Sequence, residues 1–290
     1  MTISLNPTEN LFDPAINKQN YSSISLSIQL SLKYLSFCII DNSQNKFLAI
    51  VNYVFPEKVS SFVLADFINK LFEYESLLKK EYKNIIISYE CTQSTLIPDE
   101  IYDNSNKEIY LSFFNQEIED KIIISNFAPE LKLYSIFAIP KCINNAFQNN
   151  LSNYKIIHSS NSYFQSIYNN FSNTENFNSK IFVDVESHSF EIVIFRNNKL
   201  LFNNSFQFKT KVDFLYYLLF VLNQLNINPV KIQLVLSGKI TPNSSIFNLL
   251  TKYISNIIFI ENQSNFTFSD VLSQIPPQQY FKLLNQIKCV

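Results

Sequence analysis

The apolar and polar positions of the first ninety residues change from one periodicity to another. Short β-rich runs separated by turn residues predict three consecutive strands over Ser25–Ser31, Leu35–Asp41 and Phe47–Phe55. Across Glu57–Tyr82 the apolar residues then recur at helical spacing, and the apolar run Ile85–Tyr89 predicts a fourth strand. The elements of this segment therefore follow the order βββαβ.

The same order of elements recurs in the second part of the chain. Asn197 and Asn198 predict a two-residue hairpin turn, and Thr210 three residues before Asp213 indicates an acidic capping box at a helix start. The predicted elements are strands over Lys180–Val185, Phe190–Phe195 and Lys199–Phe206, a helix from about Thr210, a strand over Ile232–Ser237, a helix over Asn243–Ser255 and a strand over Ile257–Ile260. Two segments of matching order predict a duplicated fold.

A hairpin-rich stretch, Lys121–Ile139, interrupts the first half before that half is complete. The half then closes with a helix over Lys141–Asn149, a strand over Lys155–His158 and a helix over Tyr163–Phe171, and the polar run Ser172–Ser179 marks the joint. Helices that alternate with strands favour a mixed α/β architecture. We expect a first half over residues 21–175 with an inserted unit near 107–139, a second half over 176–275, and terminal extensions over 1–20 and 276–290.

Gly238 is the only glycine among the 290 residues, whereas average usage near 7% predicts about twenty. Glycine admits positive φ and lets main-chain N–H groups approach a phosphate closely. Phosphate-binding loops and dinucleotide-binding fingerprints both depend on that property. The sequence contains neither motif.

Charge and cysteine usage exclude several further classes. A net charge of −1 with dispersed Lys and Arg gives no basic stripe, so we expect no nucleic-acid partner. No apolar run reaches the length of about 18 residues that a membrane span needs, and we expect no integral membrane segment. The scattered cysteines lack CxxC spacing, which argues against zinc and disulfides and favours a cytoplasmic location.

The duplicated order resembles the actin-like ATPase superfamily, whose two RNase H-like βββαβαβ halves bracket a nucleotide. In that family the first strand of each half ends in an Asp-x-Gly turn, where Asp organises Mg²⁺ and Gly admits phosphate. Val183–Ser187 matches this turn in the second half, with Asp184 retained and Glu186 in place of the glycine. Ile28–Ser31 matches it in the first half, and both key residues differ.

Two further stretches carry the resemblance. Leu236–Lys239 falls at the family's Gly-Gly turn beside adenosine and keeps one glycine of the two, Gly238. Ala138–Lys141, followed by a helix, a strand and a helix, looks like a segment of the pilus-assembly and cell-division branch. Across nearly its whole length the chain also resembles a bacterial family, domain of unknown function 3822, most closely in Leu26–Ile40 and Asn204–Ile240. The resemblance implies a bilobed actin-like fold and no established activity.

The aligned turns contain the candidate site residues. The resemblance implies that a nucleotide, if one binds, contacts Asp184, Ser187, Gly238 and Lys239. Glu186 would add negative charge where a triphosphate has to sit. We therefore expect no catalytic residue, no metal cluster and no bound cofactor.

Two function classes remain open. The first is a non-catalytic protein-binding module on a degenerate actin-like fold, and the second is a nucleotide-dependent ATPase or switch with an atypical cleft. The inserted unit Lys121–Ile139 is the expected contact surface, because its strands can offer an edge to a partner peptide. The pilus-related resemblance implies an envelope-associated protein partner, and self-association through the same edge is the rival outcome.

Overall fold

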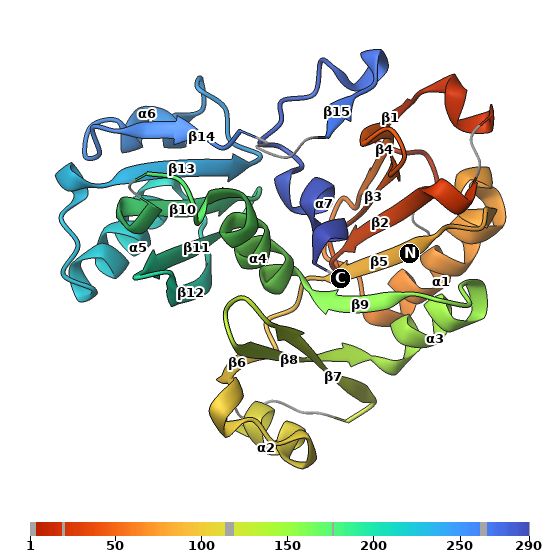
Figure 1. The fold of residues 1–290 in the computed structure, drawn as a ribbon, viewed down its shortest axis with the longest axis horizontal. Helices are drawn as coiled ribbons and strands as arrows, with labels where there is room; N and C mark the ends of the chain where they lie inside the picture. Colours follow the sequence, from red (N-terminus) through yellow and green to blue (C-terminus); the bar gives the residue numbers. More distant parts are fainter. Residues whose placement is uncertain (1–3, 19–20, 114–118, 176, 262–265, 290) are drawn as a thin grey trace. The chain divides into compact units, whose positions relative to one another are not determined.

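The computed structural model describes residues 4–18, 21–113, 119–175, 177–261 and 266–289. The chain forms two compact units (Figure 1). Unit 1 comprises Met1–Ser162, Asn265–Gln274 and Lys282–Val290, and unit 2 comprises Tyr163–Ser264 and Ile275–Phe281. The domain limits expected from the sequence, 21–175 and 176–275, stay a prediction.

Unit 1 is built on a mixed sheet with the strand order β1-β4-β3-β2-β5-β9. Strands β2, β3 and β4 form an antiparallel meander, while β5 and β9 continue the sheet in parallel from β2. Both terminal regions contribute short strands that pair with β4, β1 antiparallel and β15 parallel. The strand bounds are β1 Glu9–Phe12, β2 Ile24–Leu30, β3 Tyr34–Asp41, β4 Lys46–Val54, β5 Asn84–Tyr89, β9 Lys155–His158 and β15 Thr267–Phe268.

The two faces of this sheet have different coverings. Helices α1 (Ser61–Tyr74) and α3 (Lys141–Asn150) lie on the apolar face, where the rings of Phe72 and Phe147 are 6.5 Å apart (Figure 1). The other face carries serines and a glutamine at alternate positions of β2 and contacts residues 282–289. There the side-chain amide of Gln286 donates to main-chain oxygens of β2 and β5. The C-terminal segment is thus part of the unit 1 core.

The inserted unit is a separate three-stranded antiparallel sheet of order β6-β8-β7. The hairpin predicted over Lys121–Ile139 is confirmed as β7 and β8. Leu111, Ile136 and Ala138 form a small core under helix α2. The element bounds are β6 Ser94–Pro98, α2 Lys107–Ser112, β7 Lys121–Ala128 and β8 Leu133–Pro140; residues 114–118 of the expected insert lie outside the described ranges.

Unit 2 is built on a five-stranded sheet of order β12-β11-β10-β13-β14. Its antiparallel meander and its parallel strands match β4-β3-β2-β5-β9 of unit 1 position by position. The predicted duplication of the α/β fold is therefore confirmed. The element bounds are α4 Ser159–Phe171, β10 Lys180–Val185, β11 Ser189–Arg196, β12 Lys199–Gln207, α5 Lys211–Gln224, β13 Gln233–Gly238, α6 Ser245–Leu250 and β14 Ile257–Phe259. Helix α7 (Phe281–Asn285) begins at the last residue of unit 2, and its other residues belong to unit 1.

Two local sequence signals are also confirmed in unit 2. Asn197 and Asn198 connect β11 to β12 with φ values of 53° and 58°, as a tight hairpin with two left-handed residues requires. Thr210 and Asp213 form a reciprocal capping box at the start of α5. Apolar residues of β10, β11 and β13 pack against α5 and α6 on one face of the sheet. On the other face Phe182 contacts Phe171 of α4, with ring centroids 5.4 Å apart.

Candidate functional site

A row of polar residues crosses the unit 2 sheet at one register position. Ser237 of β13 pairs with Asp184 of β10, Asp184 with Glu191 of β11, and Glu191 with Ser205 of β12. Asp184 and Glu191 are only 3% and 4% exposed, so both carboxyl groups need hydrogen-bond donors from the protein. We call these four residues the unit 2 polar row.

Side chains of unit 2 donate hydrogen bonds to both carboxyl groups. The Ser237 hydroxyl donates to Asp184 Oδ1 at 2.7 Å, and Asn203 Nδ2 donates to Glu191 Oε1 at 2.7 Å. The Tyr163 hydroxyl lies 2.9 Å from Ser237 Oγ. Because the single Ser237 proton points to Asp184, Tyr163 is the donor of this second bond. Asp184, which the resemblance aligns with the family's magnesium-organising residue, is thus held in a buried chain of hydroxyl groups.

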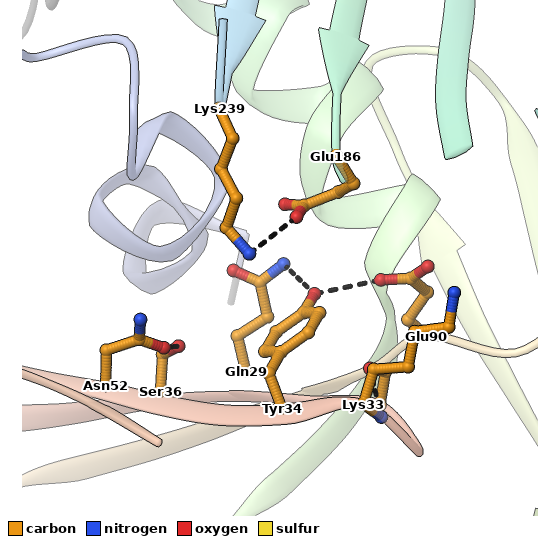
Figure 2. A network of polar contacts seen from close by, with 9 residues as sticks. Gln29, Lys33, Tyr34, Ser36, Asn52, Glu90, Glu186 and Lys239 are labelled. Carbon is orange, nitrogen blue, oxygen red and sulfur yellow. Dashed lines mark hydrogen bonds and ion pairs between the residues drawn. The ribbon is translucent and has the colours of Figure 1, made fainter. Parts of the chain in front are cut away.

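The turn after β10 is occupied by an ion pair. Glu186 Oε2 and Lys239 Nζ lie 2.9 Å apart, and their side chains are 21% and 31% exposed (Figure 2). The negative charge expected from Glu186 is therefore balanced by Lys239, which had been predicted as a nucleotide contact. Ser187, also predicted as a contact, lies exposed at the tip of this turn with His188.

Gly238 is required by packing within unit 2. Its φ is +83°, and a Cβ atom at this position would lie 2.3 Å from the main-chain oxygen of Val185 and 2.8 Å from its nitrogen. The Gly238 N–H donates to the main-chain oxygen of Gln278 at 2.8 Å. The close approach of β13 to β10 therefore accounts for the glycine without any ligand.

Unit 1 carries a corresponding polar row at the same sheet positions. Ser88 of β5 pairs with Gln29 of β2, Gln29 with Ser36 of β3, and Ser36 with Asn52 of β4. Ser36 Oγ donates to Asn52 Oδ1 at 2.7 Å (Figure 2). Gln29 occupies the position that Asp184 has in unit 2, so unit 1 has a neutral amide where unit 2 has a carboxyl group. We call these four residues the unit 1 polar row.

A hydrogen-bond chain fills the turn position of unit 1. Gln29 Nε2 donates to the Tyr34 hydroxyl at 2.8 Å, and that hydroxyl donates to Glu90 Oε2 at 2.9 Å (Figure 2). Ser31, at the position of the family's glycine, accepts the main-chain N–H of Lys33 on its hydroxyl oxygen at 3.0 Å. The polar groups that follow β2 are therefore paired with one another.

The other side chains that could take part in chemistry include histidines and cysteines. His158 is buried; its Nδ1 accepts the N–H of Ser160 at 3.2 Å, so its Nε2–H donates to the Cys91 oxygen at 3.0 Å, as a neutral imidazole does. Burial raises the pKa of the Cys38 and Cys91 thiols to about 12, which keeps them protonated at neutral pH. The described part of the chain has no group of three or more His, Cys, Asp or Glu residues arranged to hold a metal ion.

Some members of both polar rows could be anticipated from the sequence and others could not. Polar residues at alternate positions inside otherwise apolar strands, such as Gln29 and Ser88, indicate a polar sheet face. Nothing in the sequence pairs Tyr34 with Glu90 or Tyr163 with Ser237, because these partners are 56 and 74 residues apart. The pairing emerges only from the fold.

The duplicated sheets, with one polar row each, define an actin-like ATPase fold. A solved structure from Bacteroides thetaiotaomicron, described as a protein with an actin-like ATPase fold and unknown function, matches with a TM-score of 0.76 and 23% identity over 93% of this chain and 97% of that chain. The type IV pilus biogenesis complex PilM–PilN matches with a TM-score of 0.64 and 11% identity over 92% and 98%.

The family model for proteins of unknown function DUF3822 matches residues 13–257. The chain belongs to this family. A search of curated proteins finds no match. No helix among the described residues is long and apolar enough to cross a membrane.

Proposed function

We propose that this protein is a non-catalytic protein-binding module on a degenerate actin-like ATPase fold. The observation that carries the proposal is the internal pairing of the groups that would otherwise contact Mg²⁺ and phosphate. In unit 2, Ser237 binds Asp184 and Lys239 binds Glu186. A bound triphosphate would have to displace a carboxylate from Lys239, and Glu186 would then repel it.

A nucleotide-dependent switch is the alternative, and the retained Asp184 is the observation that favours it. Its carboxylate is a suitable magnesium ligand in chemical type. Its buried position under Ser237 and Tyr163 opposes direct coordination, because both hydroxyl groups would have to move. We therefore rank this alternative second.

The inserted unit supports a protein partner. Ile101, Ile109 and Phe113 are 66%, 53% and 78% exposed, and the same unit carries a stack of Tyr102 on Tyr134 with ring centroids 3.6 Å apart. Adjacent exposed apolar side chains of this kind mark interaction surfaces. We propose this surface as the principal contact with a protein partner.

The open edge of the inserted sheet is β6, which lies outside the Lys121–Ile139 stretch that was expected to offer the edge. Asn126 of β7 donates its side-chain amide to the Ile156 oxygen of β9 at 3.0 Å, so β7 packs against the main sheet of unit 1. Strand β6 pairs with β8 alone among the described strands. A partner peptide that adds a strand would therefore pair with Ser94–Pro98.

The PilM–PilN neighbour was solved as a complex with a protein partner. That precedent supports an envelope-associated partner for this chain as a proposal. The free state of Cys38, Cys91, Cys142 and Cys289 supports a reducing, cytoplasmic compartment.

The test is affinity capture from the native cell. The intact chain is compared with an Ile109→Ser, Phe113→Ser variant whose fold is verified by circular dichroism, and with Tyr253→Ser, which alters an equally exposed aromatic residue of unit 2. We expect one set of proteins to be retained by the intact chain and by Tyr253→Ser, and lost with the insert variant. Identical capture by all three chains would contradict the proposed surface.

A further inference from the structure

A second apolar surface lies on unit 2, along helix α5. Val212, Tyr216 and Phe220 follow one another at intervals of four residues, and their side chains are 61%, 60% and 47% exposed. Residues at this spacing form one stripe along a helix. An exposed apolar stripe marks a site that another molecule covers more often than ordinary monomer surface.

The stripe continues onto strand β12 through aromatic contacts. The Tyr216 ring lies 5.4 Å from the Tyr217 ring and 6.1 Å from the Phe220 ring. Tyr217 in turn stacks on Phe206 of β12 at 5.3 Å. Helix stripe and strand therefore form one continuous surface, which we call the α5–β12 surface.

Strand β12 is an open edge. It ends the strand order of the unit 2 sheet, and among the described strands it pairs with β11 alone. The Ser205 N–H donates to Oδ1 of Asn204 at 2.9 Å, so it faces away from β11. Every second residue of an antiparallel strand turns its main-chain groups to the same side, so Asn203 and Gln207 face the open edge as well. Such an edge can accept a further strand.

The charges around this surface identify the kind of strand that fits. Asp213 is the nearby acid, and its carboxylate is occupied by the main-chain N–H groups of Lys209 and Thr210 at 3.0 and 2.9 Å. Exposed cations border the surface at both ends: Arg196, Lys199, Lys209 and Lys211. Two copies of the chain paired through β12 would bring these cations together, which disfavours self-association.

We propose that the α5–β12 surface binds an acidic, extended peptide segment of a partner protein. The peptide adds as a strand to β12, places apolar side chains at alternate positions over Tyr216 and Phe220, and directs Asp or Glu toward the bordering lysines. The proposal rests on the protein-binding function above, and it assigns a site on a different unit from the insert. The acidic chemistry is the feature that separates this partner from a generic apolar one.

The test is selection of a displayed library of random ten-residue peptides on the full-length chain. We expect enriched peptides with net negative charge and apolar residues at every second position. Their dissociation constants should rise at least tenfold in each of two double variants, Tyr216→Ser with Phe220→Ser and Lys209→Glu with Lys211→Glu. Tyr253→Ser and the insert variant Ile109→Ser, Phe113→Ser should leave peptide affinity unchanged.

The proposal is overturned if the selection enriches no peptide, or only peptides without acidic character. It is also overturned if the α5 variants bind the peptides as tightly as the native chain does. A third contradicting result is a native dimer, seen by sedimentation, that dissociates in the double variant Tyr216→Ser, Phe220→Ser. If the chain binds the acidic peptides but cell capture does not depend on the insert, the proposed insert contact alone is contradicted. If cell capture depends on the insert but the chain binds no acidic peptide, the α5–β12 surface alone is contradicted.

Discussion

The two polar rows occupy the same positions of duplicated sheets, but they differ in which polar groups are buried and in how those groups are hydrogen-bonded. The unit 2 row contains two buried carboxyl groups, Asp184 and Glu191, each with a side-chain donor. The unit 1 row contains two amides, Gln29 and Asn52, and two hydroxyl groups, and its Ser88 oxygen has no hydrogen-bond partner. The polar positions are thus the same in the two sheets, whereas the side chains that occupy them differ in chemistry.

The largest expected effect comes from Gly238, whose backbone has a positive φ. Gly238→Ala places a Cβ atom against Val185 at positive φ and should lower the free energy of unfolding by about 3 kcal/mol. The matching position of unit 1 is occupied by Tyr89, so the requirement for glycine belongs to unit 2. Denaturant unfolding measures the effect. A loss below about 0.5 kcal/mol, as expected for exposed Ser187→Ala, would contradict the packing explanation.

The next comparison uses a matched pair of serines. Ser237→Ala removes one hydrogen-bond donor to buried Asp184 and should cost about 2 kcal/mol of unfolding free energy at neutral pH. Ser88→Ala removes a buried hydroxyl oxygen that lacks a partner, and should be neutral or slightly stabilising. Thermal and denaturant unfolding of the two variants give the comparison directly. Equal losses would show that Asp184 does not depend on Ser237.

A smaller effect is expected at the Glu186–Lys239 ion pair. Both side chains are partly exposed, so solvent screens the interaction. A double-mutant cycle with Glu186→Gln and Lys239→Met should give a coupling energy of about 0.5 kcal/mol that decreases in high salt. The pair therefore matters for charge balance more than for stability. A coupling of several kcal/mol would contradict this interpretation.

The smallest effect concerns the pH dependence of helix starts. Main-chain hydrogen bonds, first from Thr210 and then from Lys209, lower the pKa of Asp213 below its ordinary value of 3.8. The folded pKa is the lower one, so the contribution of Asp213 is complete above the unfolded pKa and is lost as pH falls through the folded pKa. Helix α1, capped by Ser60 without an acid in its first turn, lacks this dependence.

Amide exchange corrected for intrinsic rates provides the measurement. Acidification should release the first amides of α5 before those of α1, and Asp213→Asn should remove the difference. Parallel behaviour of the two helices in the native chain would contradict the assignment.

The sequence predicted the sheets well because their signals are local. The β-rich runs, the Asn197-Asn198 turn and the Thr210 cap are each encoded within a few residues, and all are present in the structure. The helix expected over Glu57–Tyr82 is shorter, because the chain is extended at Glu75 with ψ of 106°. Strands β1, β6 and β15 escaped prediction because they are short or only partly buried and gain their stability from pairing.

The site was predictable only in part. The resemblance to the actin-like family placed Asp184, Glu186 and Gly238 at strand-end turns, because those turns have short motifs that can be aligned. It could not show that Lys239 would bind Glu186, or that Ser237 would bind Asp184 from 53 residues away. Partner choice depends on strand register, which arises from the whole sheet.

Calorimetric titration of the full-length chain with Mg²⁺-ATP tests the central claim most directly. We expect no saturable heat up to millimolar nucleotide, a regime in which the binding free energy is weaker than about 4 kcal/mol. Asp184→Ala and the surface control Tyr253→Ser, with folding checked by circular dichroism, should give the same flat isotherm. Micromolar binding by the native chain that Asp184→Ala abolishes and Tyr253→Ser retains would contradict the claim and establish a nucleotide-dependent protein.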